Sequence, residues 1–289
     1  MRVLDRGEQL RKELDAARAA GAAVGLVPTM GALHEGHASL MERSAAECGL
    51  TAVTVFVNPL QFGPGEDLAR YPRDLDHDIE VAEVAGANVV FAPPVADMYP
   101  GGPPVTTVRV AGVEGMEAAS RPGHFDGVAT VVAKLCNLAG PCRAYFGEKD
   151  WQQLQVVRRL VADLSFPVDV VGCPTVREAD GLACSSRNAM LLPPERAAAT
   201  VLYRALTTGA AAMVPGGEDA DGGRAVMTAV IVGEEPLATL DYAEVVADTA
   251  GGWRLLVAAR IGAVRLIDNV HTDSNRHIDS NRGVSCADA

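Results

Sequence analysis

The sequence predicts an α/β protein in which a parallel β-sheet, covered by helices on both faces, is followed by a smaller α+β domain. Two observations lead to this prediction. Short aliphatic runs alternate with helix-like segments over residues 1–175, and afterwards the chain changes to Gly- and Asp-containing turns, an Ala-rich segment and strand-like runs. Alternating strands and helices are typical of doubly wound parallel sheets, whose strands are buried on both faces.

The elements of the first domain follow from the spacing of apolar residues. An apolar run at 22–28, a helix over 35–48 and a second apolar run at 50–57 form a βαβ opening. The later predicted elements are a helix over 74–85, a strand over 88–92, a helix over 125–138, a strand over 143–146, a helix over 150–164 and a strand over 168–173. We assign residues 1–175 to this domain.

A smaller domain is predicted over residues 176–269. Its expected elements are a turn at 178–182, an Ala-rich helix over 194–207, a Gly-rich connector over 215–223 and two strand-like runs at 241–247 and 257–269. The tail over 270–289 contains the sequence DSNR twice and has almost no apolar content, so we expect it to be disordered.

Composition excludes several classes of protein. The 289 residues are 48% hydrophobic and carry a formal net charge of −12, which argues against a disordered chain and against a nucleic-acid partner. No uncharged apolar run approaches the roughly 18 residues of a membrane span, and the first residues carry charges unlike a secretory signal. The six cysteines are scattered without a CxxC pair. We therefore expect a cytoplasmic protein with reduced thiols and no membrane or nucleic-acid partner.

The segment PTMGALHEGH, residues 28–37, places two histidines where a helix begins. His34 and His37 are three residues apart, so both imidazoles share one helical face. A helix N-terminus after a strand offers unpaired N–H groups and a positive dipole end, which suit phosphate oxygens. The pattern favours binding of a nucleotide phosphate. A zinc pair or two surface histidines are the alternatives, although the spacing is not HExxH and no third ligand cluster is evident.

Two amide side chains, Asn58 and Gln61, follow directly on a predicted central strand in FVNPLQFG. Ligands of open α/β sheets bind beyond such strand ends. An amide can donate to a carboxylate and accept from a hydroxyl or ammonium group, so the pair can orient a small polar substrate. Taken alone, an ordinary Asn-Pro turn is the better explanation of this segment.

Three further segments are weaker candidates. Lys149, in FGEKDWQQ, lies at a strand-to-helix junction and can pair with a phosphate, but a solvated helix end capped by Asp150 explains it equally well. The loop LACSSRN, residues 182–188, supplies hydroxyls and a guanidinium as phosphate donors. His124 and Asp126 begin an amphipathic helix that we interpret mainly as packing.

The chain resembles the pantothenate synthetase (pantoate–beta-alanine ligase) family. The resemblance covers about residues 1–269 and rests on segments in the family's order and at about its spacings: PTMGALHEGH, FVNPLQFG, RPGHFDGVATVV, FGEKDWQQ, SSRN and RLLVAARIGAVRLIDN. It implies a Rossmann-like nucleotidyltransferase domain with an HxGH signature, a smaller C-terminal lid domain, and a homodimer in the cytoplasm.

The resemblance also implies a two-step condensation. The carboxylate of (R)-pantoate attacks the α-phosphorus of ATP and releases pyrophosphate, and the amine of β-alanine then displaces AMP from pantoyl adenylate to give pantothenate. A free carboxylate is a poor acyl electrophile, so the protein mainly positions the reactants and stabilises charge at phosphorus. Mg²⁺ is expected with ATP, bridging phosphates and keeping several waters, so that few protein ligands are needed.

The family's functional residues carry over to matching positions here. The catalytic residues so implied, with His37 as proton donor, are His37, His34, Lys149, Arg187, Ser185 and Ser186. The ATP-binding residues so implied are Met30, Gly31, Ala32, Leu33, His34, Glu35, Gly36, His37, Gly147, Glu148, Lys149, Asp150, Val176, Cys184, Ser185, Ser186 and Arg187. The resemblance implies that Gln61 and Gln153 bind pantoate. It also implies that Gln61 contacts β-alanine and that Asn58 lies nearby.

The sequence departs from the family pattern at two positions. Cys184 stands where Met or Leu usually precedes SSR, and Trp151 stands where Tyr or Phe usually follows GEKD. Neither change removes a catalytic group. In YPRDLDHDIE, His77 occupies a position that is often acidic, which leaves Asp76 and Asp78 as the candidate carboxylates near the metal.

Two other functions fit part of the pattern. A nucleotidyltransferase that transfers AMP or CMP to a phosphorylated acceptor shares the HxGH turn. Such an acceptor calls for additional Arg or Lys where this sequence has the neutral amides of Gln61 and Gln153. The second alternative is a nucleotide sensor that kept the fold without catalysis, against which the complete set of His, Lys and Ser-Ser-Arg residues argues.

Overall fold

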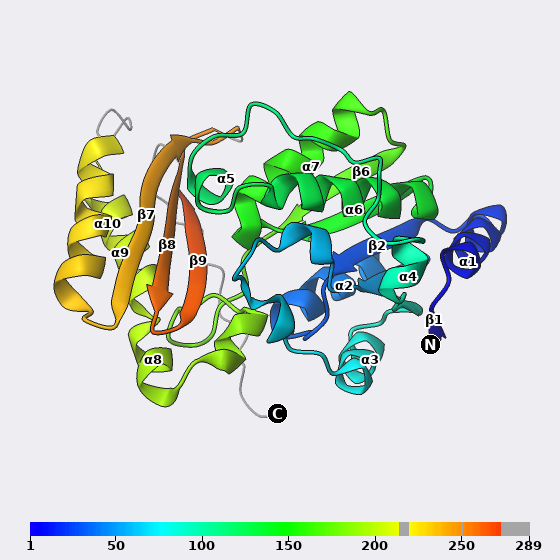
Figure 1. The fold of residues 1–289 in the computed structure, drawn as a ribbon, viewed down its shortest axis with the longest axis horizontal. Helices are drawn as coiled ribbons and strands as arrows, with labels where there is room; N and C mark the ends of the chain where they lie inside the picture. Colours follow the sequence, from blue (N-terminus) through cyan, green and yellow to red (C-terminus); the bar gives the residue numbers. More distant parts are fainter. Residues whose placement is uncertain (214–219, 250, 273–289) are drawn as a thin grey trace. The chain divides into compact units, whose positions relative to one another are not determined.

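The computed structural model describes residues 1–213, 220–249 and 251–272, and the chain divides into two compact units, Met1–Cys173 and Pro174–Ala289 (Figure 1). The division falls after Cys173, whereas the sequence analysis places it after residue 175. Within the described ranges, no helix combines the length and the hydropathy that crossing a bilayer requires.

A six-stranded parallel sheet forms the centre of the first unit (Figure 1). Its strands are β1 (Arg2–Leu4), β2 (Val24–Thr29), β3 (Leu50–Val55), β4 (Val89–Phe91), β5 (Cys142–Gly147) and β6 (Val168–Cys173). They lie in the order β1-β4-β3-β2-β5-β6, and every neighbouring pair is parallel. The direction of strand succession reverses between β2 and β5, and at such a switch point an open α/β sheet forms a crevice beyond its strand ends.

Helices cover both faces of this sheet. They are α1 (Gly7–Ala19), α2 (Glu35–Glu47), α3 (Leu75–Val84), α4 (Val95–Met98), α5 (Met116–Ser120), α6 (His124–Ala139) and α7 (Trp151–Asp163), with 3-10 turns at Pro59–Gln61, Asp67–Ala69 and Glu148–Asp150. One apolar cluster joins α1, α6 and α7 to strand residues such as Leu26, and another joins α2 and α3 to strand residues such as Val27. Because successive strand residues point to opposite faces, the two clusters are the two sides of one buried sheet.

The second unit combines a three-stranded antiparallel sheet with helices (Figure 1). Its elements are a 3-10 turn (Ser186–Met190), α8 (Pro193–Ala198), α9 (Val201–Ala212), α10 (Ala220–Glu234), β7 (Ala238–Ala247), β8 (Trp253–Ile261) and β9 (Val264–Thr272). Helix α9 packs on β8 and β9, and α10 packs on β7. Their apolar faces meet in one core that includes Leu206, Met227 and Val257, as expected for an α+β domain.

Two predicted helical boundaries in this unit are wrong. The Ala-rich stretch 194–207 is divided between α8 and α9 rather than forming one helix. The predicted Gly-rich connector 215–223 includes residues of α10, and its residues 215–219 lie outside the described ranges. Ala220, Val226 and Met227 of α10 join the core, and this burial outweighs the low helix propensity of the glycines.

The strand predictions in this unit also need correction. The run 257–269 is predicted to be one strand, but Gly262, with φ 56°, turns the chain between β8 and β9. Strand β9 continues to Thr272, so residues 270–272 belong to the sheet and not to the predicted tail. The rest of that predicted tail, 273–289, lies outside the described residues.

The close approach of α6 to the turn after β3 depends on a glycine. A Cβ added at Gly127 would lie 2.2 Å from the Leu60 carbonyl oxygen and 2.6 Å from the Gln61 nitrogen. Both are backbone atoms, so neither can move without displacing the 3-10 turn that carries Gln61.

Gly127→Ala is therefore expected to lower the free energy of unfolding of the first unit by about 3 kcal/mol, at the upper end of the usual cost of overpacking. Urea denaturation followed by circular dichroism measures this loss. Gly233→Ala in α10 is the matched control, because a Cβ there meets no atom within 4 Å. That change should raise stability by roughly 0.5–1 kcal/mol through the entropy of the unfolded chain. Equal stability of the Gly127→Ala variant and the unsubstituted protein would contradict the close contact.

Candidate active site

Three sequence motifs meet at the carboxyl edge of the first unit's sheet. Strand β2 leads into the segment that contains His34 and His37, β3 leads into Asn58 and Gln61, and β5 leads into the Glu148–Asp150 turn. The three strands are adjacent, in the order β3-β2-β5, so the sheet brings their C-terminal loops together. This group of loops includes the switch point between β2 and β5.

The turn that precedes α2 is held by a buried carboxylate. Gly31 and Ala32 adopt positive φ values of 81° and 50°. Asp78, only 1% exposed, accepts hydrogen bonds from the backbone N–H groups of Ala32 (3.1 Å) and Leu33 (2.6 Å). Burial raises the pKa of this carboxyl, and the two N–H donors oppose that shift. Both oxygens serve the turn, which argues against the suggestion that Asp78 is a metal ligand.

The two histidines of this segment stack against each other at the start of α2. Their ring centroids are 4.1 Å apart. His34 is the N-cap residue, and its Nδ1 accepts a hydrogen bond from the Gly36 N–H at 3.1 Å, so the neutral ring carries its proton on Nε2. Burial, then the neighbouring His37, lowers the pKa of His34 to about 2. Burial likewise lowers the pKa of His37 to about 4. Both imidazoles are therefore neutral near pH 7.

The Lys149 ammonium group acts electrostatically on both histidines. Its positive charge contributes to the lowered pKa of both His34 and His37, while the Asp150 carboxylate opposes that shift at His37. The Lys149 side chain is only 18% exposed, and its Nζ lies 3.7 Å from Asp150. Asp150 precedes α7 without a side-chain capping bond. Asp150 occupies the N-cap position that this alternative predicted, but the Lys149 side chain is not solvated as the alternative requires.

One polar atom of this cluster is left without a partner. Among the residues that the structure describes, no group forms a hydrogen bond with the buried Nδ1 of His37. An unpaired buried polar atom costs roughly 1–3 kcal/mol, and such atoms at functional sites are commonly satisfied by a ligand or water. Two neutral imidazoles, an ammonium group and helix N–H groups together make a site suited to an anionic ligand.

The Asn58 amide is fully engaged within the protein. Its Nδ2 donates to Gln61 Oε1 (3.0 Å) and to the Gly127 carbonyl (3.1 Å), and its Oδ1 accepts from the Leu60 N–H (3.3 Å) and the Tyr99 hydroxyl (2.8 Å). Only 1% of Asn58 is exposed. These four bonds use both donors and both acceptor positions of the amide, which argues against the predicted direct contact with substrate.

Gln61 faces the histidine-containing turn. Its Nε2 lies 3.1 Å from the thioether sulfur of Met30, and the residue is 8% exposed. Its backbone carbonyl accepts from His124 Nδ1 (2.9 Å) and Arg121 Nη2 (3.3 Å). Arg121 in turn donates to both carboxylate oxygens of Glu66, at 2.9 and 2.7 Å. Gln61 is therefore held through its backbone as well as its side chain.

Sequence reasoning missed most of these supporting residues. It interpreted His124 as packing, yet this imidazole donates to Gln61 and accepts from Arg121 Nη1 at 3.1 Å. Burial, then the Arg121 charge, lowers the pKa of His124 to about 4. Asp126 binds the N–H of Val110 at 2.8 Å. The only signal in the sequence was the RPGHFDG segment itself, because the partner loops are distant along the chain.

Gln153 and the loop of the second unit complete the set of predicted site residues. Gln153 lies half-buried in the first turn of α7, directly after the Glu148–Asp150 turn. In the second unit, the Cys184 N–H donates to the Val176 carbonyl at 3.0 Å, and Ser185 Oγ accepts from the Arg187 N–H at 3.3 Å. One hairpin and the turn that follows it therefore contain all of these predicted residues. Val176 and Cys184 pair across the hairpin, and residues 185–187 begin the turn.

No group of three or more His, Cys, Asp or Glu side chains is arranged to hold a metal ion in ranges 1–213, 220–249 and 251–272.

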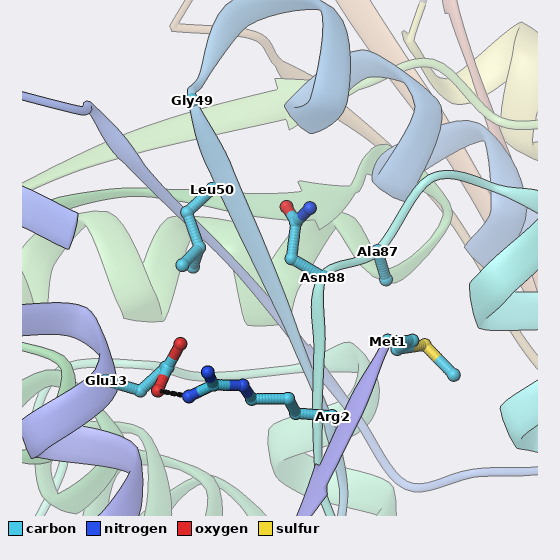
Figure 2. A pocket seen from close by; sticks show the side chains of 7 residues that line it. All are labelled: Met1, Arg2, Glu13, Gly49, Leu50, Ala87 and Asn88. Carbon is cyan, nitrogen blue, oxygen red and sulfur yellow. Dashed lines mark hydrogen bonds and ion pairs between the residues drawn. The ribbon is translucent and has the colours of Figure 1, made fainter.

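A pocket of about 530 Å³ lies at the amino ends of the strands, with Arg2 paired to Glu13 beside Leu50 and Asn88 (Figure 2). This pocket is at the opposite edge of the sheet from His34 and His37. It does not contribute to the candidate site.

Comparison with known sequences identifies the family. The profile of the Pantoate-beta-alanine ligase family matches residues 2–271. The chain belongs to the pantoate-beta-alanine ligase family. A pantothenate synthetase of Chloroflexus aurantiacus is 50% identical over 278 residues, covering 93% of this chain and 97% of the relative. A pantothenate synthetase of Deinococcus radiodurans is 52% identical over 273 residues, covering 89% and 96%.

Solved structures of this ligase family have the same fold. The pantothenate synthetase of Thermus thermophilus superposes with a TM-score of 0.85 at 48% identity, covering 94% of this chain and 99% of that one. A pantoate-beta-alanine ligase of Francisella tularensis, complexed with beta-gamma ATP and beta-alanine, superposes with a TM-score of 0.80 at 32% identity, covering 96% and 99%. The predicted family, ligase class and Rossmann-like fold with a smaller α+β domain are confirmed.

Three histidines of this ligase with lowered pKa values make its stability depend on pH. The pKa values of His34, His37 and His124 are lowered from 6.5 to about 2, 4 and 4. The unfolded chain binds protons below pH 6.5 and the folded protein does not, so their contribution is complete above that pH and is lost as the pH falls toward 4. As the pH falls through this range, each histidine lowers the free energy of unfolding by up to about 1.4 kcal/mol per pH unit.

We therefore expect the melting temperature to fall steadily between about pH 7 and pH 5, as measured by scanning calorimetry without ligands. His37→Gln removes one of these protonation sites and should make the fall shallower. A melting temperature that stays constant over this range in the unsubstituted protein would contradict the lowered pKa values of these histidines.

Proposed function

We propose that this ligase condenses (R)-pantoate with β-alanine in an ATP-dependent reaction that yields pantothenate, AMP and pyrophosphate through pantoyl adenylate. The observation that carries the proposal is the grouping of His34, His37 and Lys149 at the switch point, with Gln61 beside them on the next loop. Membership of the ligase family supports the same chemistry, as does the related Francisella tularensis ligase, which is complexed with beta-gamma ATP and beta-alanine.

In the first step, the protein must stabilise negative charge as the pantoate carboxylate attacks the α-phosphorus and pyrophosphate departs. We assign to His34 the donation of its Nε2 proton in a hydrogen bond to a phosphate oxygen, because its Nδ1 is occupied by Gly36. Lys149 supplies the positive charge. His37 is our candidate for the proton donor, since a bound phosphate favours its protonated form.

In the second step, the β-alanine amine attacks the acyl carbon, the bond to AMP breaks, and the amine loses a proton. Gln61 and Gln153 are assigned to pantoate, and Gln61 also to β-alanine. Val176, Cys184, Ser185, Ser186 and Arg187 are assigned to ATP on the family resemblance. These assignments place charge stabilisation, rather than a covalent protein intermediate, at the centre of catalysis.

Mg²⁺ is proposed to enter with ATP as part of the substrate. The described residues offer it no cluster of carboxylates, and Asp78 already accepts two backbone N–H bonds. The residues therefore fit an ion held chiefly by phosphate oxygens and water. Its chemistry would be to neutralise phosphate charge while His34 and Lys149 hold the phosphates.

We also propose a cytoplasmic homodimer. Cys48, Cys136, Cys142 and Cys173 are free thiols, which suits a reducing compartment. The Val108 and Val110 N–H groups, two residues apart, bond to Thr130 and Asp126 of α6, which is the spacing of an extended segment. We assign the opposite edge of this segment to pairing with a second copy, and sedimentation velocity tests the dimer.

The test of the catalytic proposal is chromatographic product analysis with ATP, magnesium, (R)-pantoate and β-alanine, each omitted in turn. AMP and pantothenate should appear together only in the complete mixture. Formation of ADP, or product formation without β-alanine, would reject the adenylate mechanism. The rival transfer to a phosphorylated acceptor is disfavoured because Arg121, a cation that contacts Gln61, is already paired with Glu66.

A further inference from the structure

The orientation of the Asn58 amide is set by backbone atoms that cannot change role. The Leu60 N–H can only donate and the Gly127 carbonyl can only accept, so Oδ1 must face Leu60 and Nδ2 must face Gly127. The second donor of Nδ2 then points at Gln61 Oε1. The second acceptor position of Oδ1 points at the Tyr99 hydroxyl, which donates at 2.8 Å.

This arrangement also fixes the Gln61 amide. Because Oε1 accepts from Asn58, the NH2 group is the end that faces Met30. A thioether is a weak acceptor, so a substrate oxygen can replace it at little cost. The group that Gln61 presents to the site is therefore a donor, which suits a carboxylate or hydroxyl oxygen and disfavours an ammonium group.

We propose that Tyr99 is a positioning residue for recognition of the hydroxy-acid substrate, acting through Asn58 to keep the NH2 group of Gln61 turned toward that substrate. Tyr99 follows α4, is 5% exposed and packs edge-on against Phe56 at 5.9 Å between ring centroids. It is remote in sequence from both partners. The inference deepens the proposed function, and it rests on the assignment of pantoate to the Gln61 side of the site.

Tyr99→Phe tests the proposal, because it removes one hydroxyl and keeps the ring that packs on Phe56. The KM for pantoate should rise about 3- to 10-fold, which corresponds to loss of one buried hydrogen bond. The KM for ATP should stay within roughly 2-fold of its original value. A general loss of structure would instead change both constants and lower the melting temperature.

Tyr145→Phe is the matched control. Tyr145 is also buried, and its hydroxyl donates to Glu47 at 2.9 Å, among residues that the site does not use. This variant removes a buried, hydrogen-bonded hydroxyl and should leave the KM for pantoate unchanged. An equal rise of the KM for pantoate in Tyr99→Phe and Tyr145→Phe would overturn the proposal.

A double-mutant cycle separates action through Gln61 from any other effect. In the Gln61→Ala background, Tyr99→Phe should no longer change kcat/KM for pantoate, because the amide that it orients is gone. Additive effects of the two substitutions would overturn the proposal. Asn58→Asp, which places an oxygen where Gln61 Oε1 and the Gly127 carbonyl need a donor, should weaken pantoate binding more than Tyr99→Phe does.

These outcomes are distinct from failure of the proposed function. If the unsubstituted protein forms no AMP and pantothenate, the function itself is wrong. If it forms both but Tyr99→Phe leaves the KM for pantoate unchanged, the function stands and the positioning role fails.

Discussion

His37→Ala is expected to lower kcat by about 10²- to 10⁴-fold, the usual contribution of a positioned proton donor, while the KM for ATP changes by only a few-fold. The imidazole is half-buried and stacks on His34, and its buried Nδ1 pairs with no described residue. Its interactions should therefore strengthen most when charge develops on the phosphates in the transition state. Steady-state kinetics with saturating pantoate and β-alanine measures both constants.

His37→Gln distinguishes proton transfer from hydrogen bonding at this position. Glutamine keeps an N–H donor but cannot transfer a proton near neutral pH. If proton transfer matters, this variant should be nearly as slow as His37→Ala. Recovery to within about 10-fold of the original kcat would show that a fixed donor is sufficient. Equal losses of ATP binding and of turnover in His37→Ala would contradict a role in the transition state.

The parts of the site that sequence analysis located are those encoded in contiguous motifs. His34 and His37 lie on one helical turn, and Lys149 lies beside the next strand end, so strand order alone brings them together. The sequence around each of these residues was compatible with both a binding role and a surface role, because it does not show which side chains are buried. The 18% exposure of Lys149 and the lowered pKa values of the histidines come from the packing of several loops.

The residues that sequence analysis missed act across long separations. Tyr99 reaches Asn58 from 41 positions away, and Arg121 reaches Glu66 from 55 positions away. Each looks like an ordinary surface or packing residue in its own segment. A single sequence carries no pairing signal for such contacts, whereas the amide geometry of Asn58 is unmistakable once the four partners are assembled.

The fold was predictable where apolar periodicity was strong. The βαβ units from β2 to β6 have strands buried on both faces, and the sequence shows them as aliphatic runs. The missed elements lack this signal. Strand β1 has only three residues with none fully buried, and α1 has Leu10 and Leu14 as its only buried side chains apart from a glycine. Tertiary packing at the sheet edge forms these elements.

Asp268→Asn is expected to lower the free energy of unfolding of the second unit by about 3–5 kcal/mol, the usual cost of breaking a buried ion pair. Asp268 accepts two hydrogen bonds from the Arg177 guanidinium, at 2.7 and 2.9 Å, and the Asp268 and Arg177 side chains are 1% and 8% exposed. The substitution keeps the size of the side chain but leaves the Arg177 charge buried and uncompensated. Chemical denaturation of the purified variant measures the loss.

A surface pair on the same sheet provides the control for this prediction. Arg265 and Asp241 form an ion pair at 2.7 Å, but their side chains are 17% and 33% exposed, so Asp241→Asn should cost no more than about 1 kcal/mol. Equal losses of the free energy of unfolding in the two variants would show that burial does not determine how much these ion pairs stabilise the fold. Arg177 also holds the Gly181 carbonyl at 3.0 Å and adjoins Val176 in the hairpin assigned to ATP. Asp268→Asn should therefore also raise the KM for ATP, whereas Asp241→Asn should not.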